Sequence, residues 1–273
     1  MSDLYALPLP RTAFRIHAIA VCTFLVAPAL IVVPVSFSSG SIIAFPLPGF
    51  AFDWYGEVLH SVAWRNALAN SLIIGSSAAL LATALGMGGA LGLDRLSRRM
   101  KSIVMMLTLL PFVVPIILIA LGGYLALALL DLNNTYAGVV VLHATLGIPF
   151  VTISVLAALR GFDRNLWRAA SGLGASPIVA FRRVMLPIIL PGVVTGAVFA
   201  FATSLDEVVV ASFVTAPTQR TLPLQMFAGI KENTGPIVTA VATLLLLLSG
   251  GFLICVELLR RRSDRFRSIQ SVT

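Results

Sequence analysis

The chain has 273 residues, of which 11% are charged and 58% are hydrophobic, and its mean hydropathy is +0.99. About a quarter of the residues of a soluble globular domain are charged, so this composition excludes such a domain and indicates a membrane protein. The formal net charge of +8 does not indicate nucleic-acid binding, because the basic residues gather in short segments between long apolar runs.

Six apolar runs follow one another along the chain, each close to the roughly 20 residues that cross a bilayer as a helix. Backbone polar groups in lipid must be hydrogen-bonded within their own segment, so each run is predicted to be helical and the fold class all-α. The first run is longer than the apolar part of a signal peptide and is counted as a span. The predicted spans are about Ile16–Ser36, Leu68–Leu93, Ile103–Leu130, Tyr136–Leu159, Ile188–Val214 and Pro236–Leu259.

The basic residues predict the orientation in the membrane. All but three of the 19 fall in segments that face one side, and the exceptions are Arg65, Arg220 and Lys231. By the positive-inside rule, both termini are therefore cytoplasmic. The predicted organisation is a cytoplasmic N-terminal segment (1–15), a six-helix transmembrane domain (16–259) and a basic cytoplasmic tail (260–273). The excess positive charge is attributed to topology and to contact with anionic lipid.

Proline and glycine mark the predicted third, fourth and fifth spans. Pro111, Pro115 and Pro149 interrupt apolar runs, which predicts either kinked helices around a cavity or simple packing irregularity. The pairs Gly88-x-x-x-Gly92 and Gly192-x-x-x-Gly196 have the spacing that lets two membrane helices approach closely.

The cytoplasmic loop of about residues 160–187 has helical periodicity of its own. Asp163 is predicted to cap a short amphipathic helix, which Gly172 and Gly174 then interrupt. Ser176-Pro177 is the typical start of a second helix, with serine as N-cap and proline in the first helical position. The sequence therefore predicts a helix–glycine–helix elbow, which is too structured for a tether and suits a docking surface.

Within this elbow, Arg168-Ala169-Ala170-x-x-x-Gly174-Ala175 is followed by Val184-x-Leu186-Pro187. The stretch is similar to the E-A-A-x3-G-x9-I-x-L-P loop of permeases from type I ABC importers, with matching spacing throughout. Arg168 stands where the family has glutamate, which reverses a charge, and Val184 stands where it has isoleucine. The resemblance implies the family fold of six transmembrane helices with a cytoplasmic coupling elbow. The residues it implies in coupling to an ATPase are Arg168, Ala169, Ala170, Gly174, Ala175, Leu186 and Pro187.

The likeness continues through Phe199-Ala200-Phe201, Ser204-Leu205-Asp206-Glu207-Val208-Val209-Val210 and Thr221-Leu222-Pro223-Leu224-Gln225-Met226. These stretches resemble the second permease of the spermidine/putrescine transport family. The resemblance implies a bacterial inner-membrane subunit that imports a small amine-bearing solute, with a polyamine as the first expectation. It also implies three kinds of partner, which are a homologous second permease in a heterodimer, two ATPase subunits and a periplasmic solute-binding protein. An amino acid-like or opine-type solute remains an alternative.

The chain itself carries no sign of catalysis. It has no G-x4-G-K-[ST] loop, so ATP and Mg²⁺ are expected to bind to the partner ATPase and no cofactor to this chain. His17, His60 and His143 fall in separate regions, which argues against a metal site and a membrane-embedded enzyme. A proton-coupled secondary carrier would need an internal repeat or an ionisable relay, and no segment has a second copy.

Two carboxylates lie in the predicted fifth span. Asp206 and Glu207 follow its cytoplasmic end by about 18 residues, or about 27 Å of helix, which places them in the outer half of the bilayer. A charge at that depth marks a solute pathway or a partnered structural site. Thr203, four residues before Glu207, is expected on the same face, so Thr203, Asp206 and Glu207 form the candidate solute pathway. The alternative is a structural pair that caps a helix or bridges to the partner permease.

One position argues for a less cationic solute. Many polyamine-type permeases carry an acid directly after the proline of the third span, whereas Ile116 follows Pro115 in this chain.

Overall fold

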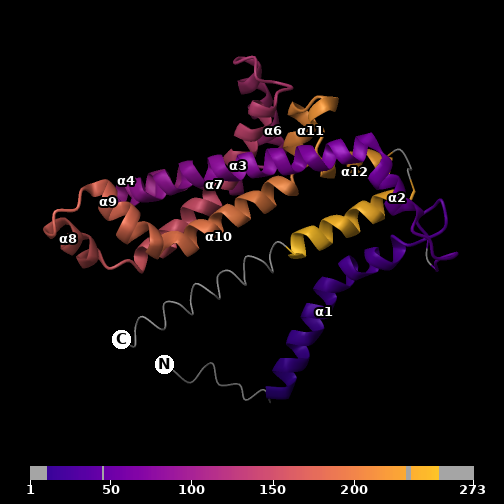
Figure 1. Cartoon of the computed structure of the whole chain (residues 1–273), viewed down its shortest axis with the longest axis horizontal. Helices are drawn as coiled ribbons and strands as arrows, with labels where there is room; N and C mark the ends of the chain where they lie inside the picture. The colour runs from indigo at the N-terminus through magenta and orange to yellow at the C-terminus, as the bar shows by residue number, and fades with distance from the viewer. Residues whose placement is uncertain (1–10, 45, 232–234, 252–273) are drawn as a thin grey trace. The chain divides into compact units, whose positions relative to one another are not determined.

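The computed structural model describes residues 11–44, 46–231 and 235–251, and most of these residues are helical (Figure 1). The chain divides into two units, which are Met1–His60 with Gly229–Gly251, and Ser61–Ala228 with Phe252–Thr273. In the described ranges the only β-type pairing is an isolated bridge between Ser38 and Phe50. The predicted basic tail, the end of the predicted sixth span at Leu259 and residues 1–10 of the predicted N-terminal segment lie outside the described residues.

The first unit begins with one long apolar helix, α1 (Arg11–Val35), most of whose described side chains are exposed. After α1 the chain forms an aromatic cluster with the short helix α2 (Asp53–His60). The rings of Phe37 and Tyr55 are 5.2 Å apart, and the Trp54 indole nitrogen donates to the Ser38 carbonyl at 2.8 Å. The apolar helix Ile237–Gly251 also belongs to this unit.

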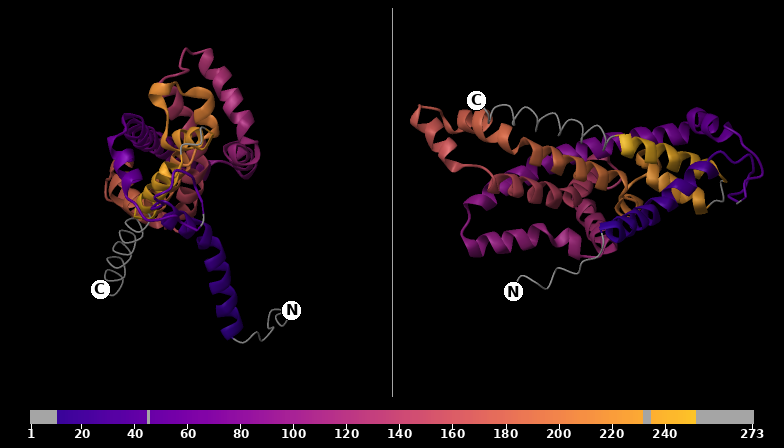
Figure 2. Two further views of the ribbon diagram at one scale, coloured as in Figure 1. Left: turned by 90° about the vertical axis from the view of Figure 1, so that its right-hand side faces the viewer. Right: turned by 90° about the horizontal axis from the view of Figure 1, so that it is seen from below.

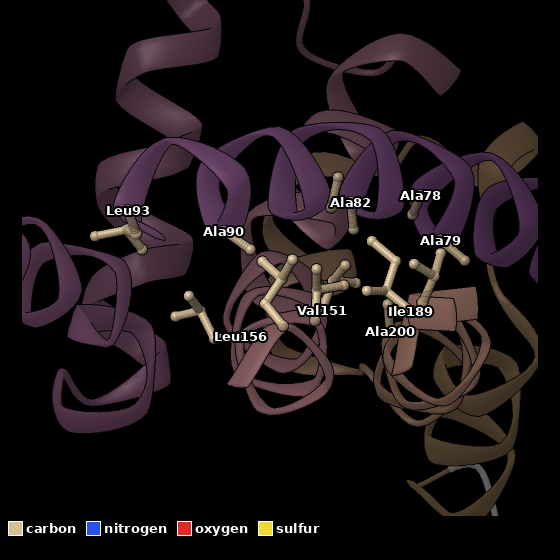
Figure 3. Packing of buried hydrophobic residues seen from close by; sticks show 13 residues of the cluster. Ala78, Ala79, Ala82, Ala90, Leu93, Val151, Leu156, Ile189 and Ala200 are labelled. Atoms are coloured by element: carbon tan, nitrogen blue, oxygen red, sulfur yellow. The ribbon is translucent and has the colours of Figure 1, made fainter. Parts of the chain in front are cut away.

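The second unit is built on three long helices that all contact one another, α3 (Val62–Arg95), α7 (Tyr136–Arg160) and α10 (Leu186–Leu205). Nearly half of the buried residues between them are alanine, and valine, leucine and isoleucine fill the remaining space, as Figure 3 shows. Small side chains let membrane helices pack closely, and van der Waals contact then stabilises the bundle. Buried residues at this centre include Ala78, Ala82, Ala90, Val151, Val155, Ile189 and Ala200.

Glycines set the closest approaches of these helices. A Cβ on Gly196 would lie 2.6 Å from the Cα of Val151, and one on Gly192 would lie 2.8 Å from the Ser154 carbonyl oxygen. The close approach predicted from Gly192 and Gly196 is therefore confirmed. The prediction from Gly88 and Gly92 is not met within the described part of the chain, where a Cβ added at either position would have no contact within 4 Å.

Gly86 takes the role that the sequence assigned to Gly88 and Gly92. A Cβ on Gly86 would lie 2.7 Å from the Cβ of Val151. Gly86 is four residues from both Ala82 and Ala90, which are also fully buried, so all three share one face of α3. Gly86 lies at the contact because it is on the face of α3 that packs against α7. The four-residue spacing of two glycines does not identify that face.

The predicted third span is broken into three helices, α4 (Arg98–Thr108), α5 (Leu110–Val113) and α6 (Ile116–Ala128). Pro111 and Pro115 lack the N–H that an uninterrupted helix needs, and each lies where a new helix starts. The predicted kink is confirmed, but a single helix over Ile103–Leu130 is wrong. Pro149, in contrast, remains inside α7 without breaking it.

The predicted fifth span is also broken. The helix ends at Leu205 and a short helix, α11 (Val209–Val214), follows it, so an unbroken helix over Ile188–Val214 is wrong. α11 lies beside α6 in Figures 1 and 2 and contacts it. Val210 and Val214 of α11 are buried in a second apolar cluster with Ala120 of α6.

The loop after α11 is fastened to the outer end of α3. It contains a 3₁₀ turn (Pro217–Gln219) and leads to α12 (Leu222–Lys231). The buried Asn70 amide donates to the carbonyls of Thr218 and Arg220 at 2.9 and 3.0 Å, and Tyr136 donates to the Asn70 carbonyl oxygen at 2.7 Å. These bonds tie the loop to α3 and α7.

Four helices have the length and composition to cross a membrane, among the residues that the structure describes. Two shorter apolar helices, Ile116–Ala128 and Ile237–Gly251, fall in the predicted third and sixth spans. The six apolar runs of the sequence thus correspond to six helical regions, of which four are full spans by length. The four long spans are Thr12–Val35, Val62–Arg95, Tyr136–Arg160 and Pro177–Leu205.

Candidate functional site

The cytoplasmic elbow begins with helix α8 (Arg164–Gly172). The Asp163 carboxylate accepts a hydrogen bond from the Asn165 backbone N–H at 2.9 Å, which satisfies one of the free N–H groups of the first turn. The predicted N-cap is confirmed. Because the accepting carboxylate of Asp163, the helix start at Arg164 and the donating N–H of Asn165 lie within three residues, this boundary is fixed locally.

The turn after α8 has the hydrogen bonds of a Schellman motif. The Ala175 N–H donates to the Ala170 carbonyl and the Gly174 N–H to the Ser171 carbonyl, both at 3.0 Å. Gly174 has a φ of +84°, which L side chains rarely adopt and which this motif requires at the position after the C-cap. The motif explains the glycine at position 174, while Ala170 contributes only its backbone carbonyl.

The second arm of the elbow begins at α9 (Pro177–Ala180). The Ser176 hydroxyl oxygen accepts from the Val179 N–H at 3.4 Å, and Pro177 occupies the first helical position, as predicted. A π-helical turn (Phe181–Met185) then leads straight into α10. Leu186 and Pro187 therefore lie in the first turn of α10, and the elbow continues without interruption into a membrane span.

One ion pair joins the elbow to the bundle. The Arg164 guanidinium lies 2.9 Å from the Asp94 carboxylate near the end of α3. Behind it is a hollow of about 240 Å³, whose lining includes Trp167, Ile178 and Phe181 of the elbow. The ion pair and this apolar lining hold the elbow against the ends of α3 and α7.

The outward surface of the elbow is apolar at its tip and basic along its arms. Leu173 at the turn is 90% exposed and Ile178 is 70% exposed. Arg168 is exposed as well, and its guanidinium makes a long hydrogen bond of 3.4 Å to the Asn165 side chain. Exposed apolar side chains beside guanidinium groups suit a protein groove with apolar and acidic contacts.

The two candidate acids lie in opposite environments at the break after α10. Asp206 is the C-cap of α10, its N–H donates to the Ala202 carbonyl, and its side chain is exposed. Glu207 is 6% exposed, and its carboxylate accepts from the Val210 N–H at 2.7 Å. The Glu207 carboxylate therefore caps a free N–H in the first turn of α11, a structural role for this one acid.

Thr203 shares a face with Asp206 and not with Glu207. Backbone angles remain helical up to Asp206, so residues three apart, such as Thr203 and Asp206, lie above one another. The helix does not reach Glu207, which corrects the expectation based on a four-residue spacing. The Thr203 hydroxyl donates within the helix to the Phe199 carbonyl at 2.8 Å.

His143 cross-links α7 to α10 just before the break. It is fully buried, and its Nδ1 lies 2.7 Å from the Ser204 hydroxyl. Ser204 was not singled out from the sequence, because only the packed structure brings it to His143.

Three aromatic rings lie in a row that the sequence does not predict. The ring centroids of Phe112 and Phe150 are 4.8 Å apart, and those of Phe150 and Phe199 are 5.8 Å apart. The rings come from α5, α7 and α10, so no sequence spacing relates them. Phe199 was noted only as part of a family-like stretch.

Comparisons with known proteins agree on one family. Residues 82–266 match the family described as binding-protein-dependent transport system inner membrane component. The chain is 31% identical to the spermidine/putrescine transport system permease protein PotC of Haemophilus influenzae, over 93% of this chain and 97% of that protein. It is 34% identical to the putrescine transport system permease protein PotI of Escherichia coli, over 97% of each.

A solved structure has the same fold. It is described as a bacterial alginate ABC transporter in complex with an alginate pentasaccharide-bound periplasmic protein. The TM-score is 0.66 at 17% identity, over 94% of this chain and 96% of that one. At this identity the similarity establishes the architecture of an importer permease, and the bound sugar belongs to that protein.

Proposed function

This chain belongs to the family of binding-protein-dependent transport system inner membrane components, and we propose that its solute is a polyamine. It is the permease subunit of an ABC importer, a multi-pass protein of the bacterial inner membrane and not an enzyme. The similarity to two polyamine permeases over nearly the whole chain carries the proposal of substrate. The exposed Asp206 carboxylate supports it, since a cation entering a membrane protein needs a partner for its charge.

The proposed partners are a second, homologous permease, two ATPase subunits and a periplasmic solute-binding protein. ATP and Mg²⁺ bind to the ATPase subunits in this proposal, and the binding protein delivers the polyamine to the outer side. The chain contributes its half of the path, with Asp206 and Thr203 on its open face. Glu207 contributes to the shape of that path by capping α11 at the break.

The elbow is the proposed contact with the ATPase. Arg168, Ala169 and Ala170 lie on α8, and the Schellman turn at Gly174 and Ala175 points the exposed Leu173 away from the bundle. The helical segment from Pro177 to Leu205 is continuous over 29 residues, or about 44 Å at 1.5 Å per residue. In this proposal, a displacement of the elbow reaches Asp206 through one continuous helical segment, which includes the π-helical turn, Leu186 and Pro187.

The test of the pathway removes the charge of Asp206 and keeps its shape. In proteoliposomes with the complete importer and its binding protein, we expect Asp206→Asn to lower spermidine or putrescine uptake at least about tenfold, or about 1.4 kcal/mol in the barrier. Assembly and basal ATP hydrolysis stay normal. Asp131→Asn is the matched control, because Asp131 is also exposed and its φ of 54° suits asparagine.

Three results decide between the alternatives. Normal uptake in Asp206→Asn would remove this carboxylate from the path. Loss of assembly together with uptake would make it a bridge between subunits. Wild-type uptake of an amino acid or opine, with none of spermidine or putrescine, would overturn the polyamine proposal and leave the permease assignment unchanged.

A further inference from the structure

Phe112, Phe150 and Phe199 form an aromatic row that is partly open. Phe150 and Phe199 are stacked with an interplanar angle of 14°, and Phe112 meets Phe150 edge-on at 62°. Phe112 is 48% exposed and Phe199 is 50% exposed. Three rings from α5, α7 and α10 thus present aromatic surface from elements that are distant in sequence.

Phe199, the member of this aromatic row that belongs to α10, lies on the same face of that helix as Asp206. Phe199 and Asp206 are seven residues apart, which is almost two full turns, so their side chains project in nearly the same direction about 10 Å apart along the axis. Between them the exposed Ala202 leaves the space open. Gly196 and Ala200 are buried against α7, whereas Phe199 and Asp206 are both exposed.

The two ends of this face attract a cation by different means. The Asp206 carboxylate offers a full charge. The rings offer the negative face of an aromatic quadrupole, which attracts ammonium groups, and an apolar surface for methylene groups. A helix face that contacts only lipid or another helix does not need a carboxylate and aromatic rings at this spacing.

We propose that the aromatic row and Asp206 form a two-point site for a linear organic cation with ammonium groups at both ends of a methylene chain. One ammonium group pairs with Asp206, while the methylene chain and the second ammonium group lie along the rings of Phe199, Phe150 and Phe112. This site rests on the proposed polyamine function and assigns to the rings a part in selecting the solute. A single carboxylate does not discriminate between a diamine and a monoamine. Two binding positions at a fixed separation do.

The decisive variant keeps apolar volume and removes the aromatic face. In the complete importer, we expect Phe199→Leu to raise the KM for spermidine uptake at least about fivefold, with the maximal rate and basal ATP hydrolysis unchanged. Phe199→Tyr retains the ring and keeps the wild-type KM. Phe24→Leu, on the exposed surface of α1, makes the same chemical change outside the site and leaves uptake unchanged.

Phe112→Leu is the second variant, because Phe112 comes from another helix and tests the site should Phe199→Leu fail to assemble. The same rise in KM is expected. An unchanged KM in an assembled Leu variant at either position overturns the two-point site. An equal loss of uptake in Phe199→Leu and Phe199→Tyr also overturns it, because that result indicates that Phe199 packs against the partner permease. If the wild-type importer takes up no polyamine at all, the proposed function fails first, and that result is distinguishable from both.

Discussion

Asp206 and Glu207 are neighbours in sequence, yet the break in the helix leaves Asp206 exposed and Glu207 buried. The end of α10 leaves Asp206 in a helical conformation on the open face, while the chain turns Glu207 inward. The buried carboxylate then supplies the acceptor that Val210 loses when α10 ends.

We therefore expect Glu207 to matter for stability and Asp206 for uptake. Glu207→Ala leaves the Val210 N–H without a partner in a buried place, at a cost of about 1–3 kcal/mol. Glu207→Gln keeps an acceptor oxygen and costs less. The melting temperature of the purified complex, followed by tryptophan fluorescence, should fall in the order wild type, Gln, Ala. A normal melting temperature with lost uptake in Glu207→Gln would show instead that its charge acts in transport.

At the scale of elements, what the sequence predicts well is what forms locally. The caps at Asp163 and Ser176 and the turn at Gly174 depend on hydrogen bonds spanning two to five residues, so motif and spacing were enough to locate the elbow. The apolar runs were predictable because their composition alone meets the needs of lipid.

What the sequence did not predict depends on contacts between distant segments. The break after Leu205 lets α11 pack on α6, and hydropathy does not register it because Val209–Val214 is as apolar as the span before it. The use of Gly86 in place of Gly88 or Gly92 depends on which face of α3 meets Val151. The aromatic row likewise exists only after three helices are assembled.

Two glycines of the elbow allow a matched test. A side chain at Gly172 or at Gly174 would meet no atom within 4 Å, but only Gly174 has a positive φ. Gly174→Val is therefore strained by about 1–3 kcal/mol and should distort the turn, whereas Gly172→Val places a side chain on an ordinary helical residue. With equal amounts of both variants in the membrane, co-purification of the ATPase subunits and solute uptake should drop only for Gly174→Val. Equal results for the two variants would argue against docking through this turn.

At the scale of the whole molecule, ATP-driven transport requires this chain to be moved by ATP hydrolysis that takes place in another subunit. The full sequence has no phosphate-binding loop of the G-x4-G-K-[ST] type. The segment Pro177–Leu205 runs without interruption from the elbow to the open face that carries Asp206. In the proposed mechanism, a movement of the elbow is transmitted along this segment to the place where the solute passes.

The last prediction follows from the separation of the permease chain from the subunits that hydrolyse ATP. The purified chain alone, in nanodiscs, should hydrolyse no ATP above an empty-nanodisc control, and adding the separately purified ATPase subunits and second permease should restore hydrolysis. In that complex, the binding protein loaded with spermidine should raise the ATPase rate, because the signal passes along α10 to the elbow. Gly174→Val should lose this stimulation while Gly172→Val keeps it. Hydrolysis that persists in the highly purified single chain would contradict a pure permease role, and full stimulation in Gly174→Val would place the coupling path outside the elbow.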